Sequence, residues 1–395
     1  MAQFERGVLY TARMVGSVQL PVAAEADDIE LIQGTIQSAR SDQIRNRAGM
    51  EKTNRRIASL DGLRAVSISM VVLGHLFGRS LAHFHAAWLA GYLGWLSHYS
   101  AFGVDVFFVI SGFLITSLLL NERQRSGAIS LRNFYVRRAY RILPAAYAVT
   151  LIIAVIWHNR ISLWDVFCSL FYVQNFNPRA SWSLGHMWSL AVEEQFYLLW
   201  PFLLDHFFRY RYRLVIAAMV AAPFFRAFCG HMGWHHAEAS WFPCTMDALA
   251  TGCLLALLMK ERQINWAAFS GWFFPVLVGV LAIPQFSYPH GVQPLIMLSL
   301  QNLGIAFCIQ QCIRKEYWIL NQKPIIWIGV LSYSIYLCQE PFFQMHRTNV
   351  FERFPLNLVG VMAAAIACHY LVEKPFLRMR ERRAREMRLV AERAG

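Results

Sequence analysis

The chain has 395 residues, of which 56% are hydrophobic, 14% aromatic and only 15% charged. This composition is too apolar for an ordinary soluble protein and indicates an integral membrane protein. The formal net charge of +13 would also suit a nucleic-acid-binding protein, but the arginines lie in short blocks between apolar runs rather than on one basic surface. Membrane topology explains them better, and nucleic acid is not an expected partner.

The apolar runs predict an all-α, polytopic membrane protein with about ten transmembrane helices. Residues 1–55 contain no run long enough for a signal peptide or a span, and we expect a cytosolic, weakly structured or disordered extension there. The transmembrane domain is predicted over 56–375, followed by a basic cytoplasmic tail over 376–395. The expected spans are 60–78, 103–120, 142–157, 188–204, 214–228, 244–259, 267–284, 294–313, 325–343 and 356–372.

Loop charge predicts how these helices are oriented. If the N-terminus is cytoplasmic, the inner loops carry fourteen Lys and Arg residues and the outer loops five, and eight more follow Tyr370. The positive-inside rule therefore predicts that both termini lie in the cytoplasm, which requires an even number of spans.

An arginine and a histidine lie inside the first apolar run, LDGLRAVSISMVVLGHLF. Arg64 and His75 are eleven residues apart, which on an α-helix gives roughly 16 Å of rise and about 20° of rotation, so the two side chains share one face. Ionisable side chains at membrane depth are costly and mark functional sites by default. The alternative is that the pair snorkels to the surface or is satisfied by packing.

The second span, GVDVFFVISGFLITSLLL, carries a carboxylate near its outer end and a glycine near its middle. Asp105 either orients His75 or a hydroxyl substrate, or it caps the start of the helix. Gly112 is interpreted as a point of close helix packing or of direct contact.

The fourth span begins HMWSLAVEEQFYLLW and contains two consecutive glutamates at a depth comparable with that of His75. Adjacent residues on a helix point about 100° apart, so one of Glu193 and Glu194 is expected to face the bundle interior. Packing alone does not explain two carboxylates inside a span, and we interpret the pair as functional.

The inner loop ISLRNFYVRRAYRILP supplies a block of arginines, which positive-inside topology alone would require. Guanidinium groups also bind phosphate oxygens in a bidentate manner. Arg137 and Arg141, spaced i and i+4, and the neighbouring Arg138 are therefore candidates to bind a phosphate together with Arg64.

The eight cysteines lie mostly within apolar segments. They form no CxxC pair and have no histidine at the spacing of a zinc site, so no metal is expected. We interpret them as small core residues.

These residues suggest a reaction. The inner arginines would hold a phosphate-bearing cytosolic cofactor whose arm reaches His75, and the neutral imidazole would take a proton from an alcohol as the alcohol attacks a thioester. Glu193 or Glu194 would hold the tautomer of the histidine or bind sugar hydroxyls. Backbone groups or the side chains of Ser111, Ser189 and Tyr197 are the candidate oxyanion donors.

Five motifs in order, DGLRAVSISMVVLGH, GVDVFFVISGFLIT, FYVRRAYRILPAAY, WSLAVEEQFYLLWP and LSYSIYLCQEPFF, followed by VEKP, resemble the membrane-bound acyltransferase 3 family of bacterial O-acyltransferases. The resemblance implies a ten-helix domain of the bacterial cytoplasmic (inner) membrane that moves an acetyl or other short acyl group from acyl-CoA to a hydroxyl of an envelope or secreted glycan or glycolipid. It matches the signature arginine and histidine of the family to Arg64 and His75, and its glutamate to Glu193 or Glu194. Cys338 and Gln339 stand where many members have a Trp-His pair.

Two other functions remain open at this point. A transporter or flippase would carry a glycan or lipid through the same polar interior without acyl transfer, although no repeated broken helices support it. A membrane scaffold would need none of the buried carboxylates. Within the enzyme hypothesis, an acylated histidine intermediate is an alternative to direct attack.

Overall fold

A computed structural model describes residues 58–80, 99–262, 264–286, 292–343 and 354–394. The chain divides into two units, 1–57 and 58–395. The expected polar extension over 1–55 lies outside the described residues. The described part of the second unit is helical and contains no β-strand, which confirms the all-α prediction.

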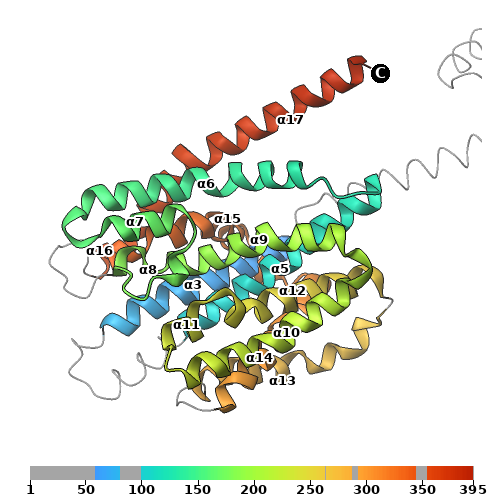
Figure 1. Ribbon diagram of the computed structural model, residues 1–395, viewed down its shortest axis with the longest axis horizontal. Helices are drawn as coiled ribbons and strands as arrows, with labels where there is room; N and C mark the ends of the chain where they lie inside the picture. The colour runs from blue at the N-terminus through green and yellow to red at the C-terminus, as the bar shows by residue number, and fades with distance from the viewer. Residues whose placement is uncertain (1–57, 81–98, 263, 287–291, 344–353, 395) are drawn as a thin grey trace, which may run out of the picture. The chain divides into compact units, whose positions relative to one another are not determined.

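Long helices make up most of the second unit, and they run side by side in Figure 1. Eight segments within the described residues are long and apolar enough to cross a membrane, which confirms a polytopic membrane protein. They fall on α3, α5, α6, α10, α11 with α12, α13, α14, and the run from α16 to α17. The bounds are α3 (Ala58–Ser80), α5 (Tyr99–Ser126), α6 (Leu131–Ile156), α10 (Arg211–His231), α11 (His235–Ser240), α12 (Phe242–Glu261), α13 (Phe273–Phe286), α14 (Val292–Lys315), α16 (Leu356–Cys368) and α17 (Lys374–Ala394).

The other two expected spans are also helices, but they are not among these eight segments. The helix α9 (Met187–His206) has 20 residues and contains both candidate glutamates, which make it more polar. The helix α15 (Lys323–Cys338) is apolar but has only 16 residues. Two short helices, α7 (Leu163–Leu170) and α8 (Trp182–Gly185), precede α9.

The structure corrects the start of the third span. We expected it at residue 142, after an arginine-rich loop, but α6 begins at Leu131. The arginines of that block are therefore helical residues. Apolar runs reveal only the part of a helix that lies in hydrocarbon, whereas a helix continues into the membrane interface where arginine is a good helix former.

Close backbone packing at glycines holds the centre of the bundle together. A Cβ atom on Gly112 of α5 would collide with the carbonyl oxygen of Leu249 on α12, and one on Gly252 of α12 would collide with that of Val109 on α5. The expectation of close packing at Gly112 is therefore confirmed. Gly329 of α15 packs equally closely against α3, because a Cβ atom there would collide with the backbone carbonyl oxygen of Asp61. The helix α3 also packs along α5, so it lies between α5 and α15.

We expect Gly252→Ala to lower the stability of the protein by about 1–3 kcal/mol, because the added methyl group forces α5 and α12 apart. Thermal unfolding in detergent micelles measures the loss. The matched control is Gly279→Ala on α13, where a Cβ atom would have nothing within 4 Å. Equal melting temperatures for the two variants would contradict this account of the packing.

Candidate active site

A cavity of about 80 Å³ lies among α3, α5, α6, α9 and α15. A single water molecule needs roughly 10–15 Å³, so the cavity has room for several. Its wall includes aromatic and aliphatic side chains, but cationic and hydroxyl groups are prominent. The polar residues in the wall are Arg64, Ser111, Arg138, Arg141, Ser189, Glu193, Tyr197, Ser332, Tyr333 and Tyr336.

Three arginines line the cavity near one another. Arg64 is near the start of α3, and Arg138 and Arg141 are near the start of α6. The guanidinium of Arg138 lies 3.7 Å from the centre of the Tyr197 ring, a cation–π contact that fixes its orientation. Arg64 also lies 3.6 Å from the carboxylate of Asp61, and Glu193 is the one carboxylate in the wall. Three guanidinium groups against these two carboxylates leave a net positive charge, which suits an anion such as phosphate.

Arg137 does not belong to this group, which corrects the expected pairing with Arg141. Its guanidinium lies 2.9 Å from the carboxylate of Glu122, and its side chain is 48% exposed. Successive helix positions point about 100° apart. Arg141 therefore lies about 40° from Arg137 and about 60° from Arg138, so helix spacing alone does not separate the two. Their contacts do, because Arg138 and Arg141 line the cavity whereas Arg137 binds Glu122 of α5 at the surface.

The imidazole of His75 is paired with a carboxylate. Its Nδ1 lies 2.9 Å from Oε1 of Glu340, whose side chain is 2% exposed. Glu340 begins the 3₁₀ turn η7 (Glu340–Phe342) that follows α15. The indole of Trp182 on α8 packs edge-on against the His75 ring, with centres 5.7 Å apart, and its Nε1 donates to the backbone oxygen of Glu340 at 3.2 Å. Trp182 thus contacts the imidazole and is hydrogen-bonded to the backbone that carries its carboxylate neighbour.

Tyr336 connects the cavity to this pair, because it lines the cavity and lies one helical turn before Glu340. Its hydroxyl donates to the backbone oxygen of His186 at 2.6 Å and lies 2.6 Å from Oγ of Ser189. Because the Tyr336 proton goes to His186, Ser189 is the donor in its contact with Tyr336. Burial lowers the pKa of His186 to about 4, so this imidazole is neutral near pH 7. His75 itself is not among the residues that line the cavity.

Of the two glutamates on α9, Glu193 lines the cavity and Glu194 does not. Oε1 of Glu193 accepts a hydrogen bond from Ser111 of α5 at 2.5 Å, and the Tyr197 hydroxyl donates to Ser111 at 3.1 Å. We expected one of these glutamates to hold the tautomer of His75 or to bind sugar hydroxyls, and the first of these roles needs a carboxylate next to the imidazole. The structure gives that position to Glu340 instead.

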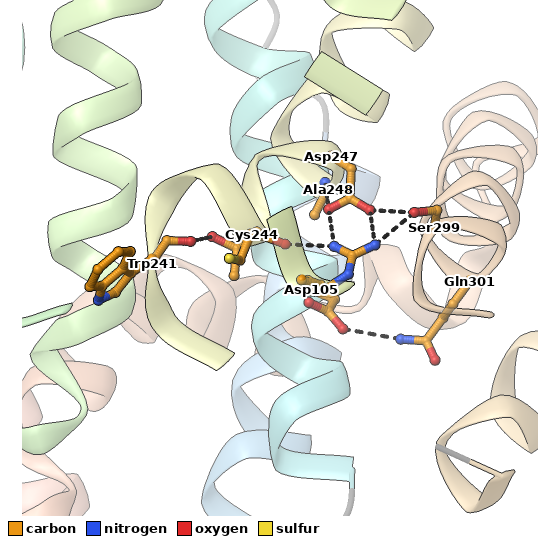
Figure 2. Close-up of polar contacts among 9 residues, drawn as sticks. Asp105, Trp241, Cys244, Asp247, Ala248, Ser299 and Gln301 are labelled. Carbon is orange, nitrogen blue, oxygen red and sulfur yellow. Dashed lines mark hydrogen bonds and ion pairs between the residues drawn. The ribbon is translucent and has the colours of Figure 1, made fainter. Parts of the chain in front are cut away.

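Asp105 lies in a different polar cluster, which corrects the expectation that it orients His75 (Figure 2). Its carboxylate accepts from Nε2 of Gln301 on α14 at 3.1 Å. Nearby, Arg226 of α10 makes two parallel hydrogen bonds to Asp247 of α12, at 3.0 and 2.9 Å, and a third to Ser299 of α14. A buried charge needs such partners, and this cluster joins four helices.

Sequence reasoning missed Glu340 and Tyr336. Both lie in the motif LSYSIYLCQEPFF, which supported the family resemblance without receiving a role. A carboxylate inside the expected span 325–343 was the available signal, by the same argument that singled out Glu193 and Glu194.

The acyltransferase 3 family model, described as an acyltransferase domain, matches residues 57–374. The chain belongs to the acyltransferase 3 family. This confirms the resemblance found in the sequence motifs. No solved structure matches the chain.

Three curated bacterial proteins are among the relatives of this acyltransferase 3 protein. An O-acetyltransferase OatA of Staphylococcus aureus is 31% identical over 326 residues, which cover 73% of this chain and 50% of the relative. The peptidoglycan O-acetyltransferase OatA of Listeria monocytogenes is 28% identical, over 81% of this chain and 54% of the relative. The putative peptidoglycan O-acetyltransferase YrhL of Bacillus subtilis is 28% identical, over 82% and 55%. The chain thus spans about half the length of these relatives.

We expect Asp247→Ala in this family member to lower the free energy of unfolding by about 3–5 kcal/mol, because it leaves the buried Arg226 guanidinium without its carboxylate partner. Chemical unfolding in mixed micelles measures the change. Glu122→Ala removes the partner of the exposed Arg137 and should cost only about 0–1 kcal/mol. Similar losses in the two variants would contradict the structural role of the buried cluster.

Proposed function

We propose that this protein is a membrane O-acyltransferase that moves an acetyl or other short acyl group from acyl-CoA to a hydroxyl of an envelope or secreted glycan or glycolipid. The observation that carries the proposal is the His75–Glu340 pair, one helical turn from a cavity that three arginines line. The relatives in Staphylococcus aureus and Listeria monocytogenes, an O-acetyltransferase and a peptidoglycan O-acetyltransferase, support acetyl as the group and a glycan as the acceptor class.

His75 is the proposed general base, and Glu340 positions it. A carboxylate next to Nδ1 favours the tautomer with the proton on Nδ1, which leaves Nε2 free to accept a proton. Nε2 takes the proton of the acceptor hydroxyl as its oxygen attacks the thioester carbonyl. The tetrahedral intermediate then collapses, the C–S bond breaks, and the thiolate of CoA leaves and takes up the proton.

Arg64, Arg138 and Arg141 are the proposed site for the phosphates of CoA. Their guanidinium groups line the cavity near one another, and the pantetheine arm would run from there toward Tyr336 and His75. The hydroxyl groups of Tyr336 and Ser189 are the proposed hydrogen-bond donors to the developing oxyanion. Each has one proton, which points to the backbone oxygen of His186 and to Tyr336 respectively, so both hydroxyls would rotate toward the oxyanion when the donor binds. The scheme uses no metal ion.

Glu193 and Asp105 receive different roles in this proposal. Glu193 faces the cavity and fixes Ser111 and Tyr197, so we assign it to the organisation of the wall and to hydroxyl binding. Glu194 and Asp105 are outside the cavity wall, and we assign them structural roles. Arg137 is assigned to the surface of the bundle rather than to the donor.

The proposed location is the bacterial cytoplasmic membrane, with the termini and the arginines of the cavity on the cytosolic side. The excess of Lys and Arg in the expected inner loops supports this orientation. Acyl-CoA would then enter from the cytosol, and the acceptor hydroxyl would approach His75 from the opposite side.

Mass spectrometry of envelope glycans from cells with and without the gene tests the function itself. We expect an added acetyl or other short acyl group only when the gene is present, and no such group with His75→Ala expressed at the same level. A glycan that changes location without gaining an acyl group would favour the transporter instead.

We expect His75→Ala to lower kcat by about 10²–10⁴-fold, the usual contribution of a general base. Glu340→Gln keeps the shape of the side chain but removes its charge, so kcat should fall while the KM for acyl-CoA stays the same. Release of free CoA thiol by protein in proteoliposomes measures both values. Full activity of the Glu340→Gln variant would contradict the proposal that Glu340 positions His75.

Arg138→Ala and Arg137→Ala are a matched pair on α6. Loss of a charge-assisted hydrogen bond to phosphate costs about 1.5–3 kcal/mol, so the Kd for acetyl-CoA should rise roughly 10- to 100-fold in Arg138→Ala. It should stay unchanged in Arg137→Ala, whose guanidinium binds Glu122. Isothermal titration of acetyl-CoA into detergent-solubilised protein checks the difference, and equal weakening in both would contradict the assigned donor site.

A further inference from the structure

Two cysteine thiols face each other where α10 and α12 meet. Cys229 is in the last turn of α10 and Cys244 is the third residue of α12, and their sulfur atoms are 3.8 Å apart. Both are buried, and they form a small cluster with Ala237 of the intervening helix α11 and the ring of Trp241.

The position of this pair separates it from the other cysteines. Cys308 and Cys312 lie one turn apart on the single helix α14. Cys338 and Cys368 contact each other between α15 and α16, but Cys368 lies well inside the candidate span Leu356–Arg383. Cys229 and Cys244 also fall in candidate spans, Phe208–His231 and His235–Glu261, but Cys229 is in the last turn of α10 and Cys244 in the first turn of α12. The connection 229–243 contains no Lys or Arg and is therefore expected on the outer side of the membrane.

We propose that Cys229 and Cys244 form a disulfide bond that fastens the α10–α11–α12 turn on the outer side of the membrane. The oxidant is a protein or small-molecule disulfide of the kind that extracytoplasmic oxidation systems supply. One thiolate attacks it and releases one thiol, and the second cysteine attacks the mixed disulfide and releases the other. Two protein thiols and one disulfide thus give one protein disulfide and two thiols.

The geometry requires only a small adjustment. A disulfide bond is about 2.05 Å long, so the sulfur atoms must approach by about 1.8 Å, which rotation of two side chains in end turns of helices can supply. The neighbouring Ala237 presents only a methyl group. The backbone oxygen of Cys244 already accepts from Arg226 at 2.5 Å, which holds the first turn of α12 in place (Figure 2).

The bond would also steady a contact that leads to the cavity. Ser240 of α11 donates to the backbone oxygen of Asn175 at 3.0 Å. The side chain of Asn175 in turn accepts from Gln195 of α9 at 3.0 Å, two residues from Glu193. Fastening α11 between α10 and α12 therefore restrains the segment that packs against the outer half of α9. This inference uses the expected orientation but does not rest on acyl transfer.

Differential alkylation of the full-length protein tests the bond. Cells are quenched in acid, free thiols are blocked with N-ethylmaleimide under denaturing conditions, and the protein is reduced and labelled with deuterated N-ethylmaleimide before peptide mass spectrometry. We expect the second label on Cys229 and Cys244 and the first label on Cys168, Cys338 and Cys368. The unreduced intact protein should be lighter by two hydrogen atoms than the reduced one.

Single variants provide the control. In Cys244→Ser, Cys229 should lose the second label and carry the first, and in Cys338→Ser the labelling of Cys229 and Cys244 should not change. Dithiothreitol-reduced protein in micelles should regain the two-hydrogen mass difference with oxidised glutathione. The first label on both cysteines of the wild-type protein, or a bond from either of them to another cysteine, would overturn the proposal.

Discussion

Ionisable side chains inside a membrane bundle are stable only when they face a partner or a water-filled space, and this constraint arranges the helices around α3 and α5. His75 of α3 lies against the carboxylate of Glu340, which follows α15. Arg64 lies near Asp61 and faces the cavity. The helix α15 approaches α3 closely enough for this because Gly329 has no side chain to separate the two backbones. Packing at a glycine thus makes the proposed chemistry geometrically possible.

The polar interior is divided into two regions with different chemistry. One contains the arginine-lined cavity and the His75–Glu340 pair, and it is open enough for water. The other contains Asp105 and the Arg226–Asp247 pair, in which each charge has a close partner (Figure 2). Satisfied charges hold helices together, whereas charges that face a cavity can bind a ligand. That difference assigns binding to the first region and support to the second.

The sequence was sufficient for the helical membrane fold, the family and seven of the ten polar residues in the cavity wall. Apolar runs and loop charge find helices, and helical spacing correctly placed Arg64 in a shared interior. Partners across the bundle were harder to predict, because a helix wheel shows which residues share a face but not which helix that face meets. Asp105 and one of Glu193 and Glu194 were therefore left as candidates to orient His75, whose partner is Glu340, 265 residues further along the chain. Arg137 was misplaced because helix spacing puts both Arg137 and Arg138 within about 60° of Arg141, and it does not show which of them meets the cavity and which meets α5.

The central claim is that one helix bundle brings a cytosolic thioester to His75. A cryo-electron microscopy structure of the full-length protein with a non-hydrolysable thioether analogue of acetyl-CoA tests it most directly. The account predicts phosphate density beside Arg64, Arg138 and Arg141, an arm that follows the cavity past Tyr336, and the acyl end within hydrogen-bonding reach of His75. An analogue bound elsewhere, or one whose acyl end points away from α3, would contradict it.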